Sequence, residues 1–302
     1  MAPKTMQAAE RLLEYYRKEK FFLYIDMWDP HEPWDPPSWY VEPYYPGYDG
    51  KVVAPPYWYY KERGISEEDL KIARACYCGE ITMVDLWVGR FIDKLKAMGL
   101  WEDTAVLFTS DHGYYFGEHG FFGKGLGQDR HWIQSPLYRE VTHIPFLLRV
   151  PGMDARRHKA LGTSIDIMPT LLDLAGVEIP QSVQGKSLIP LIKGGKPPHD
   201  FVVSSFPLNN PGEPSRIVDD WLRTVDAPHF TTVTTDRWSF LYSAEQYPAQ
   251  LYDIEQDPGE TTNVISKHWD VAEDLHGKLR TLLEKVGTSE HFMSIRRKLK
   301  KP

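Results

Sequence analysis

The sequence contains little cysteine. Its 302 residues include only two, Cys76 and Cys78. A single residue separates them, so they are poorly placed to bridge each other, and a disulfide-stabilised scaffold is excluded. A Cys-x-Cys pair can bind a metal ion, but no second pair accompanies it. We therefore expect two buried cysteines on a helix.

Long apolar runs and an excess of positive charge are also absent. No run of about 18 apolar residues occurs, so we expect no membrane-spanning helix. The N-terminal Met-Ala-Pro-Lys leads into a charged stretch and not into the apolar core of a secretory signal. The formal net charge is 35 − 42 = −7. Because phosphate backbones recruit basic surfaces, this balance argues against nucleic acid as a partner.

The composition is that of a folded chain. Hydrophobic residues make up 42% and charged residues 25%, which excludes a disordered or collagen-like protein. The length allows one large α/β domain or two smaller ones. We find neither internal repeats nor low-complexity segments.

Helical and strand patterns alternate along most of the chain. A serine at position 66, followed by three acidic residues, is a typical helix start, and Gly99 is a typical stop. Continuous short apolar runs are typical of buried parallel strands. We expect helices over residues 5–19, 66–98 and 164–175, and strands over 21–25, 105–109, 144–150 and 201–203.

From about residue 220 the pattern changes to antiparallel strands. Residues 222–225 and 232–242 alternate and turn as a hairpin does, and a final helix is expected over 270–286. The fold class is therefore α/β, with a small antiparallel sheet and a helix at the C-terminus. We expect an α/β domain over residues 1–215 and a smaller subdomain over 216–302.

Polar residues follow two of the predicted strands. Asp111 and His112 come directly after strand 105–109, and a carboxylate beside an imidazole can hold a divalent cation. The alternative is that Asp111 caps the next helix and His112 packs beneath it. His31 lies between two prolines after strand 21–25, and it could bind an anion or protonate a leaving group. The alternative is a histidine packed against a neighbouring tryptophan, Trp28 or Trp34.

A glycine-rich stretch follows Asp111 and His112. It reads Gly117-Glu-His-Gly-Phe-Phe-Gly-Lys124, and its glycines let the backbone approach a ligand closely. The charge of Lys124 suits an oxyanion such as sulfate or phosphate, although a lysine in such a loop is more often simply solvated. For His143, in Thr-His-Ile-Pro, structural hydrogen bonding is favoured over chemistry.

Together these motifs resemble the sulfatases of the alkaline phosphatase superfamily. The resemblance extends from Phe21 to about Val264, with the motifs in the order and spacing of that family. The segments that carry it are Ser110–Gly113, Gly117–Lys124, Val141–Gly152, Ser164–Gly176, Gln184–Leu188, Leu251–Glu260 and Asn263.

The resemblance implies a central, mostly parallel sheet flanked by helices, and it assigns site residues. Asp111 and His112 would be metal ligands, with calcium as the usual occupant and Mn, Mg or Zn as alternatives. Lys124 and His31 would contact the transferring sulfuryl or phosphoryl group, and His119 is added to the substrate-binding set. Many members have Asn at the position of His112, and the histidine here leans toward the phosphonate monoester hydrolase branch.

The family's nucleophile motif, Cys/Ser-x-Pro-x-Arg, is not found in this sequence. In the family its first residue is oxidised to formylglycine, whose hydrate attacks sulfur or phosphorus. Pro214-Ser215-Arg216 is similar in part, but Gly212 stands at the nucleophile position and the segment reads as a loop. The sequence therefore resembles the C-terminal portion of a sulfatase without its N-terminal strands. A truncated chain, a separate N-terminal polypeptide and a degenerate relative remain as explanations.

The resemblance implies hydrolysis of R–O–SO3⁻, a small-molecule or carbohydrate sulfate ester. A phosphonate or phosphate monoester hydrolase is the alternative within the same fold. A non-catalytic anion- or sugar-binding protein is the alternative of another class, with the aromatic residues between 34 and 60 stacking on a ligand or simply packing. Because a sheet without some of its strands exposes an apolar edge, self-association or a missing N-terminal half is also expected.

Overall fold

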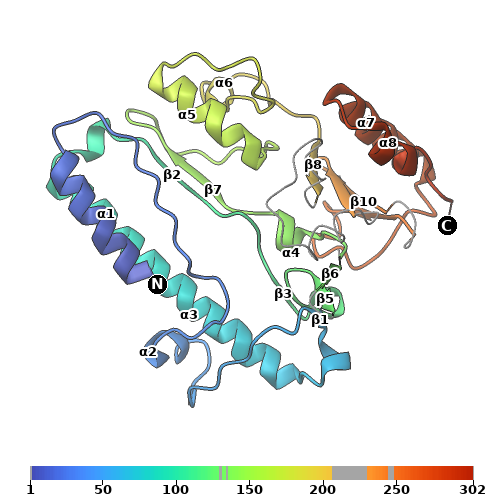
Figure 1. Cartoon of the computed structure of the whole chain (residues 1–302), viewed down its shortest axis with the longest axis horizontal. Helices are drawn as coiled ribbons and strands as arrows, with labels where there is room; N and C mark the ends of the chain where they lie inside the picture. Colours follow the sequence, from blue (N-terminus) through green and yellow to red (C-terminus); the bar gives the residue numbers. More distant parts are fainter. Residues whose placement is uncertain (1, 129–130, 134, 206–229, 244–247, 302) are drawn as a thin grey trace. The chain divides into compact units, whose positions relative to one another are not determined.

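A computed structural model describes residues 2–128, 131–133, 135–205, 230–243 and 248–301 (Figure 1). The chain divides into two compact units. Unit 1 comprises residues 1–110, 114–124 and 145–155, and unit 2 comprises residues 111–113, 125–144 and 156–302. Each unit is described by itself.

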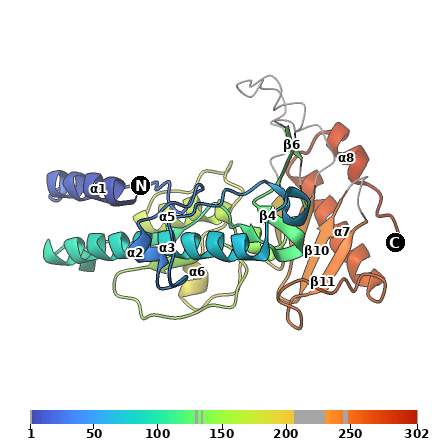
Figure 2. The same ribbon diagram turned by 90° about the horizontal axis from the view of Figure 1, so that it is seen from below.

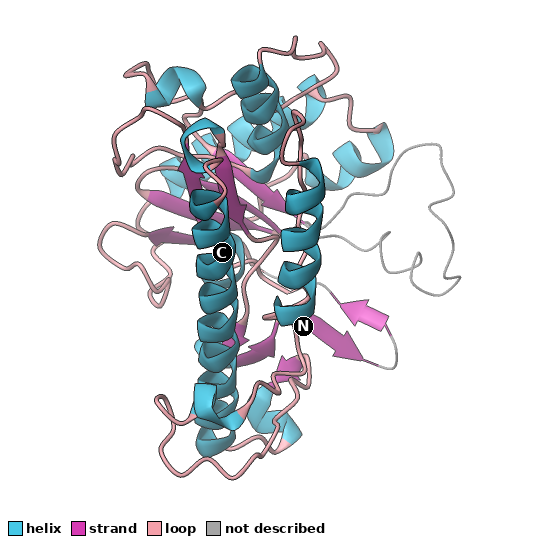
Figure 3. Cartoon of the chain, turned by 90° about the vertical axis from the view of Figure 1, so that its left-hand side faces the viewer, coloured by secondary structure: helices cyan, strands magenta, loops and turns pink. Residues whose placement is uncertain are grey.

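A pair of long helices organises unit 1. Helix α3 (Glu67–Ala97) begins at a capping box in which the Ser66 hydroxyl accepts the Asp69 N–H, and the Asp69 carboxylate accepts the Ser66 N–H. Helix α1 (Ala2–Tyr16) lies along α3, as Figure 3 shows. The helices predicted over 5–19 and 66–98 are thus confirmed, with α1 starting three residues earlier.

Apolar residues of α1 and α3 form the first core of unit 1, hereafter the helix-layer cluster. Its buried members are Met6, Ala9, Leu13, Phe91 and Leu95. Strand β2 (Val106–Thr109) reaches this cluster through Val106 and pairs antiparallel with β7 (Phe146–Arg149). These strands confirm the expected strands 105–109 and 144–150.

Aromatic side chains form the second core of unit 1. Trp34 is 1% exposed and packs against Tyr77, Tyr114, Phe116 and Phe122. The elements around it are α2 (Ser38–Val41), η1 (Tyr60–Arg63) and a sheet of β1 (Trp58–Tyr59), β4 (Phe121–Gly123) and β3 (Tyr115–Phe116) in the order β1-β4-β3, with η3 (Glu118–Gly120) between β3 and β4. Unit 1 also contains η2 (Trp101–Asp103).

Unit 2 contains a four-stranded antiparallel sheet. Its order is β11-β10-β9-β8, and helix α7 packs on it through Ala272, Leu275 and Leu279 (Figure 2). The expected C-terminal antiparallel sheet with a helix is therefore confirmed. The bounds are β8 (Val202–Ser205), β9 (Thr231–Thr234), β10 (Trp238–Tyr242), β11 (Gln250–Asp253), α7 (Trp269–Lys285) and α8 (Glu290–Arg296).

The remaining elements of unit 2 are short. The helix expected over 164–175 is present as η4 followed by α5, with Gly176 in the left-handed conformation at its end. The bounds are β5 (Leu126–Gln128), β6 (His131–Ile133), α4 (Arg139–Thr142), η4 (Ser164–Asp166), α5 (Ile167–Ala175) and α6 (Ile189–Ile192).

Several expectations differ from the structure. Every strand pairing among the described residues is antiparallel, so the mostly parallel central sheet is not seen in this part of the chain. The strand expected over residues 21–25 is not present, since these residues belong to no ladder, and the strand expected over 201–203 pairs with β9 in the C-terminal sheet. Residues 212–216, strand 222–225 and the boundary near 215 lie outside the described residues.

The described helices were considered as candidates for crossing a membrane. None of them combines the length and the apolar character that crossing a membrane requires.

Candidate active site

Lys124 and His31 meet in unit 1 although 93 positions separate them in the sequence. The Lys124 Nζ lies 2.7 Å from the His31 Nε2. Both side chains are half-buried, with 19% of Lys124 and 31% of His31 exposed. Two residues that the sequence selected separately therefore share one site.

The protonation pattern of His31 follows from its partners. Its Nδ1 lies 2.8 Å from the backbone carbonyl of Glu32, which can only accept a hydrogen bond, so Nδ1 carries the proton. The lone pair of Nε2 then accepts a hydrogen bond from the Lys124 ammonium. A neutral imidazole with its Nε2 directed at a cation can accept a proton or give way to an anion that approaches the lysine.

Glu32 is the residue of this site that sequence reasoning missed. Its carboxylate is 10% exposed and lies 3.4 Å from the Lys124 ammonium. It also accepts hydrogen bonds from the hydroxyls of Tyr57 and Tyr114. Because both tyrosines donate to it, the carboxylate is held in place as the counter-charge of Lys124.

Backbone conformation and the ring of Trp28 bring these side chains together. Tyr57 has a φ of 52° and Gly123 a φ of 125°. A Cβ on Gly123 would lie 2.8 Å from the Tyr57 ring, so glycine lets Tyr57 pack closely beside Lys124. On the other side, the Trp28 ring packs against His31 at 4.1 Å between centroids. His31 therefore packs against Trp28, one of the two tryptophans considered in the sequence analysis, and contacts Lys124 at the same time.

The segment that carries His31 is fixed by hydrogen bonds within the loop. The His31 N–H donates to the Trp28 carbonyl at 2.8 Å, and the Trp34 indole N–H donates to the Pro30 carbonyl at 3.0 Å. Both X-Pro bonds of the segment, Asp29-Pro30 and Glu32-Pro33, are cis. With Trp34 in the aromatic core, the loop is anchored where it leaves the site.

Asp111 and His112 belong to unit 2. The His112 Nε2 lies 3.4 Å from the Asp111 carboxylate, and the His112 N–H donates to that carboxylate at 2.8 Å. The His112 Nδ1 lies 3.1 Å from the Gly113 carbonyl, so Nδ1 carries the proton and Nε2 carries the lone pair. The Asp111 side chain is 82% exposed.

The donor set of this pair fits part of a divalent metal site. The carboxylate oxygen is a ligand that Ca²⁺, Mg²⁺ and Mn²⁺ prefer, and the imidazole nitrogen is a ligand that suits Zn²⁺. Among the described residues, no group of three or more His, Cys, Asp or Glu side chains is arranged to hold a metal ion. The pair would therefore need further ligands to complete a coordination sphere.

His119 occupies a tight turn of unit 1. It lies in η3 with a φ of 55°, between Gly117 and Gly120, which also have positive φ values. Its ring packs edge-on against Tyr115 at 6.2 Å between centroids. The geometry gives His119 a packing contact, and its role in substrate binding stays a prediction.

The other candidates have structural surroundings. His143 follows α4, and its Nδ1 accepts a hydrogen bond from Arg139 at 3.3 Å, in line with the structural reading. Both cysteines lie on α3, as expected, but only Cys76 is buried and Cys78 is partly exposed. Burial raises the pKa of both thiols, which keeps them protonated near neutral pH.

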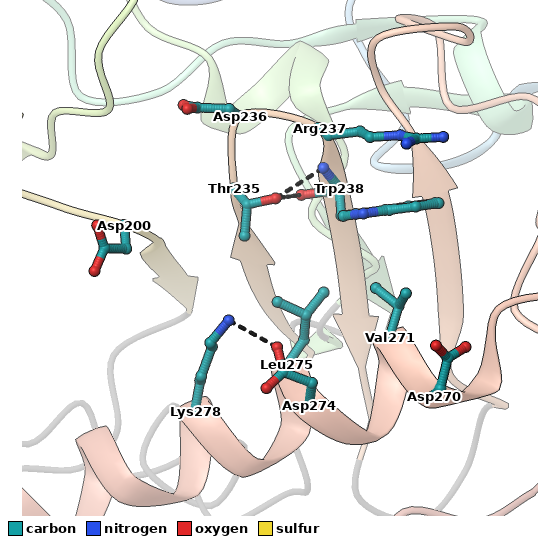
Figure 4. A pocket seen from close by; sticks show the side chains of 10 residues that line it. All are labelled: Asp200, Thr235, Asp236, Arg237, Trp238, Asp270, Val271, Asp274, Leu275 and Lys278. Atoms are coloured by element: carbon teal, nitrogen blue, oxygen red, sulfur yellow. Dashed lines mark hydrogen bonds and ion pairs between the residues drawn. The ribbon is translucent and has the colours of Figure 1, made fainter.

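A cavity of about 530 Å³ lies in unit 2, between the β9–β10 turn and α7 (Figure 4). Two of its cations are already paired, Lys278 with Asp274 and Arg237 with Asp253. Its carboxylates would repel an anionic ester, so it does not suit a sulfate group. Its lining residues are Asp200, Thr235, Asp236, Arg237, Trp238, Asp270, Val271, Asp274, Leu275 and Lys278.

Comparison with known proteins identifies the family. The chain is 32% identical over 267 residues to an arylsulfatase of Clostridium perfringens, a match that covers 82% of this chain and 49% of that protein. The chain thus spans about half the length of this relative.

Solved structures show the same fold. The crystal structure of yidJ from Bacteroides fragilis matches with a TM-score of 0.75 at 24% identity, over 98% of this chain and 61% of that one. The phosphonate monoester hydrolase of Agrobacterium radiobacter matches with a TM-score of 0.70 at 25% identity, over 93% and 60%. The family model named Sulfatase matches residues 3–177, and the chain therefore belongs to the sulfatase family of the alkaline phosphatase superfamily.

Proposed function

We propose that this chain carries the oxyanion-binding part of a sulfuric ester hydrolase. The reaction is R–O–SO3⁻ + H2O → R–OH + HSO4⁻, on a small-molecule or carbohydrate sulfate ester. The observation that carries the proposal is the 2.7 Å contact between Lys124 and His31 beside the Glu32 carboxylate. The Lys124 ammonium donates a hydrogen bond, and the His31 Nε2 can accept a proton. Two such groups side by side suit an anion whose leaving oxygen gains negative charge.

Lys124 binds the sulfuryl oxygens in this proposal. Its ammonium is partly buried, so its attraction to an anion is screened less than that of a surface lysine. Glu32 offsets the lysine charge without a bound ester and holds the ammonium in place. The substrate anion then replaces the His31 Nε2 as the acceptor of the Lys124 proton, and Glu32 remains a positioning residue.

His31 handles a proton at its Nε2. With Nδ1–H fixed on the Glu32 carbonyl, Nε2 is the atom that can take a proton from water and return it to the leaving oxygen. The cationic imidazole formed in between also attracts the sulfuryl group. His119, two positions after Gly117, is proposed as a further contact to the substrate.

Asp111 and His112 would hold the divalent metal of this enzyme. Calcium is the proposed occupant, with Mn, Mg or Zn as alternatives. When bound, such an ion balances the negative charge of the ester and makes sulfur easier to attack. The role of this chain is to supply one oxygen ligand and one nitrogen ligand, the latter oriented by the Gly113 carbonyl. The nucleophile, a formylglycine in the family, would come from polypeptide outside these residues, whether an N-terminal portion or another chain.

A phosphonate or phosphate monoester hydrolase is the second candidate. Two observations favour it: histidine at position 112, and the similarity to the phosphonate monoester hydrolase at a TM-score of 0.70. The charge and hydrogen-bond donors of Lys124 serve either oxyanion.

We also propose the division of the chain into an α/β domain over residues 1–215 and a subdomain over residues 216–302.

Binding of simple oxyanions to the isolated chain tests the proposal. Calorimetric titration with inorganic sulfate, and separately with methylphosphonate, should give measurable affinity that Lys124→Met abolishes. Lys61→Met on the surface is the matched control and should leave the affinity unchanged. Equal affinity in wild type and Lys124→Met would refute the site. A preference for methylphosphonate over sulfate would favour the second candidate.

A further inference from the structure

Trp28 lies at the outer end of a series of contacts that starts at Lys124. The Lys124 ammonium contacts the His31 imidazole at 2.7 Å, and the His31 ring packs against the Trp28 ring at 4.1 Å between centroids. The exposed fraction rises along this series: it is 19% for the Lys124 side chain, 31% for the His31 side chain and 63% for Trp28. Along these contacts the oxyanion site therefore opens toward solvent at Trp28.

Two further neighbours of Lys124 are buried or nearly so. The ammonium lies 5.4 Å from the centroid of the Tyr114 ring and 3.4 Å from the Glu32 carboxylate. Tyr114 is 8% exposed and the Glu32 side chain 10%. If Lys124 binds the sulfuryl oxygens, the alcohol portion of the ester cannot extend toward these two residues. Among these contacts, the side of His31 and Trp28 remains for it.

The Trp28 ring offers an uncovered apolar surface beside His31. The indole is the larger of the two rings, and the ring planes diverge by 41°, so the imidazole covers only part of the indole. The His31 N–H donates to the Trp28 carbonyl at 2.8 Å, which fixes the two residues relative to each other. The uncovered part of the indole is thus held next to the ring that contacts Lys124.

Exposure alone would not single out Trp28, because scattered apolar side chains are normal on a protein surface. Trp39 is 66% exposed and packs against Tyr40 at 5.9 Å between centroids. Trp28 has a similar exposed fraction, but its partner is a histidine that contacts the lysine of the site. This contact distinguishes Trp28, and Trp39 provides a matched control.

We propose that Trp28 selects the alcohol portion of the ester, by stacking on an aromatic ring bonded to the bridging oxygen. This role rests on the proposed function, which places the sulfuryl group at Lys124. Aromatic pairs prefer offset or edge-on arrangements, and an uncovered indole surface permits both. Esters of phenols should therefore bind more tightly than esters of small acyclic alcohols.

The carboxylates nearest to His31 in the sequence favour an aromatic ring over a sugar. Asp29 accepts a hydrogen bond from a backbone N–H of α1, and Glu32 accepts hydrogen bonds from the hydroxyls of Tyr57 and Tyr114. A sugar ring would need hydrogen-bond partners for its hydroxyl groups, and these carboxylates are already engaged. A phenyl ring has no such requirement.

Calorimetric titration of the whole chain with two stable sulfonates tests this role. Benzylsulfonate and ethanesulfonate both carry a methylene group where the ester has its bridging oxygen, and beyond it the first has a phenyl group and the second a methyl group. The chain should bind benzylsulfonate about tenfold more tightly, as expected for one aromatic contact together with the area that it buries. Lys124→Met should abolish the binding of both.

Variants of Trp28 separate stacking on the ligand from support of His31. Trp28→Ala should lower the affinity for benzylsulfonate about tenfold and leave the affinity for ethanesulfonate unchanged. Trp28→Tyr keeps an aromatic face and should retain most of the preference, and Trp39→Ala should change neither affinity. Equal losses for both ligands in Trp28→Ala would show that Trp28 only supports His31, and would overturn the proposal.

Failure of the stacking role and failure of the proposed function give different results. If both sulfonates bind the wild type equally and Lys124→Met abolishes the binding of both, the oxyanion site stands and the role of Trp28 is refuted. If neither sulfonate binds the wild type, the oxyanion site is refuted, and the role of Trp28 with it.

Discussion

Two neighbouring stretches of one segment differ sharply in how their backbone is satisfied. Residues 21–27 make no hydrogen bond in the described structure, whereas residues 28–34 are tied by the His31 N–H, the Trp34 indole and the carboxylate of Glu32. The first stretch belongs to no ladder, and the second contains His31 and Glu32, which both lie next to Lys124. The comparison teaches that the position of His31 and Glu32 depends on local hydrogen bonds and on the packing of Trp34, and not on strand pairing of the residues that precede them.

Of the substitutions considered, removal of the Trp34 side chain should have the largest effect on stability. Trp34 is 1% exposed and anchors the site loop in the aromatic core. Trp34→Ala should lower the free energy of unfolding by about 3–5 kcal/mol, since it leaves a large cavity. Trp39→Ala, at a side chain 66% exposed, is the control and should cost less than about 1 kcal/mol. Urea unfolding followed by far-UV circular dichroism measures both. Similar losses would mean that the aromatic core does not anchor the loop.

Glu80 links the same loop to α3 and gives it a pH dependence. The side chain is 2% exposed, one oxygen accepts the Asp35 N–H at 3.1 Å, and the other has no partner among the described residues. Burial, aided by the charge of Asp29, raises the pKa of Glu80 to about 8. The folded chain therefore binds this proton more tightly than the unfolded chain, whose carboxyl has an ordinary value near 4.5.

The sign of the resulting dependence is fixed by linkage. The stability from protonated Glu80 is fully present below about pH 4.5 and is lost as the pH rises toward 8. Over that interval the free energy of unfolding should fall by on the order of 4 kcal/mol. Glu80→Gln should remove this part of the decline, whereas Glu42→Gln at an exposed position should keep it. Thermal unfolding at pH 5, 6.5 and 8 measures this dependence. If stability falls with pH as steeply in Glu80→Gln as in the wild type, burial of Glu80 is not its cause.

Lys124 tests whether the locally held site serves catalysis. In the complete enzyme, Lys124→Ala should lower kcat/KM for an aryl sulfate by one or more orders of magnitude, because a charge aimed at the transferring group is lost. Lys61→Ala should leave kcat/KM unchanged. Unchanged turnover in Lys124→Ala would sink the assignment of this lysine.

The sequence predicts the parts of the fold that depend on local pattern. The cap at Ser66, the apolar runs of β2 and β7 and the hairpin of β9 and β10 are all readable, since each depends on neighbours within a few residues. Residues 21–25 show the limit. Their apolar run predicts a strand, but the structure has none at these residues, because strand pairing depends on residues far away in the sequence.

The candidate site was predictable to a similar degree. Lys124 and His31 stand in motifs that resemble the sulfatase family, so their residue types drew attention before any contact was known. Glu32 is one position from His31 and reads as an ordinary loop acid. Its partners Tyr57 and Tyr114 are distant in sequence, and the positive φ of Tyr57 leaves no sequence signal, because that conformation is rare for tyrosine.

Substitution of Glu32 should have the smallest effect on activity. It also separates a residue that positions Lys124 from one that binds the substrate. Glu32→Gln removes a negative charge beside Lys124, so an anionic ester should bind at least as well as before. The amide can accept from one tyrosine but opposes the other with its own N–H groups, which loosens the Lys124 ammonium. We expect kcat to fall about fivefold while KM stays equal or decreases, a difference of roughly 1 kcal/mol in the barrier. A loss of packing alone would instead lower the stability and raise KM. Steady-state kinetics of the complete enzyme with Glu32→Gln, and with Glu19→Gln as the exposed control, separates the two: a raised KM with unchanged kcat would show that Glu32 does not position Lys124.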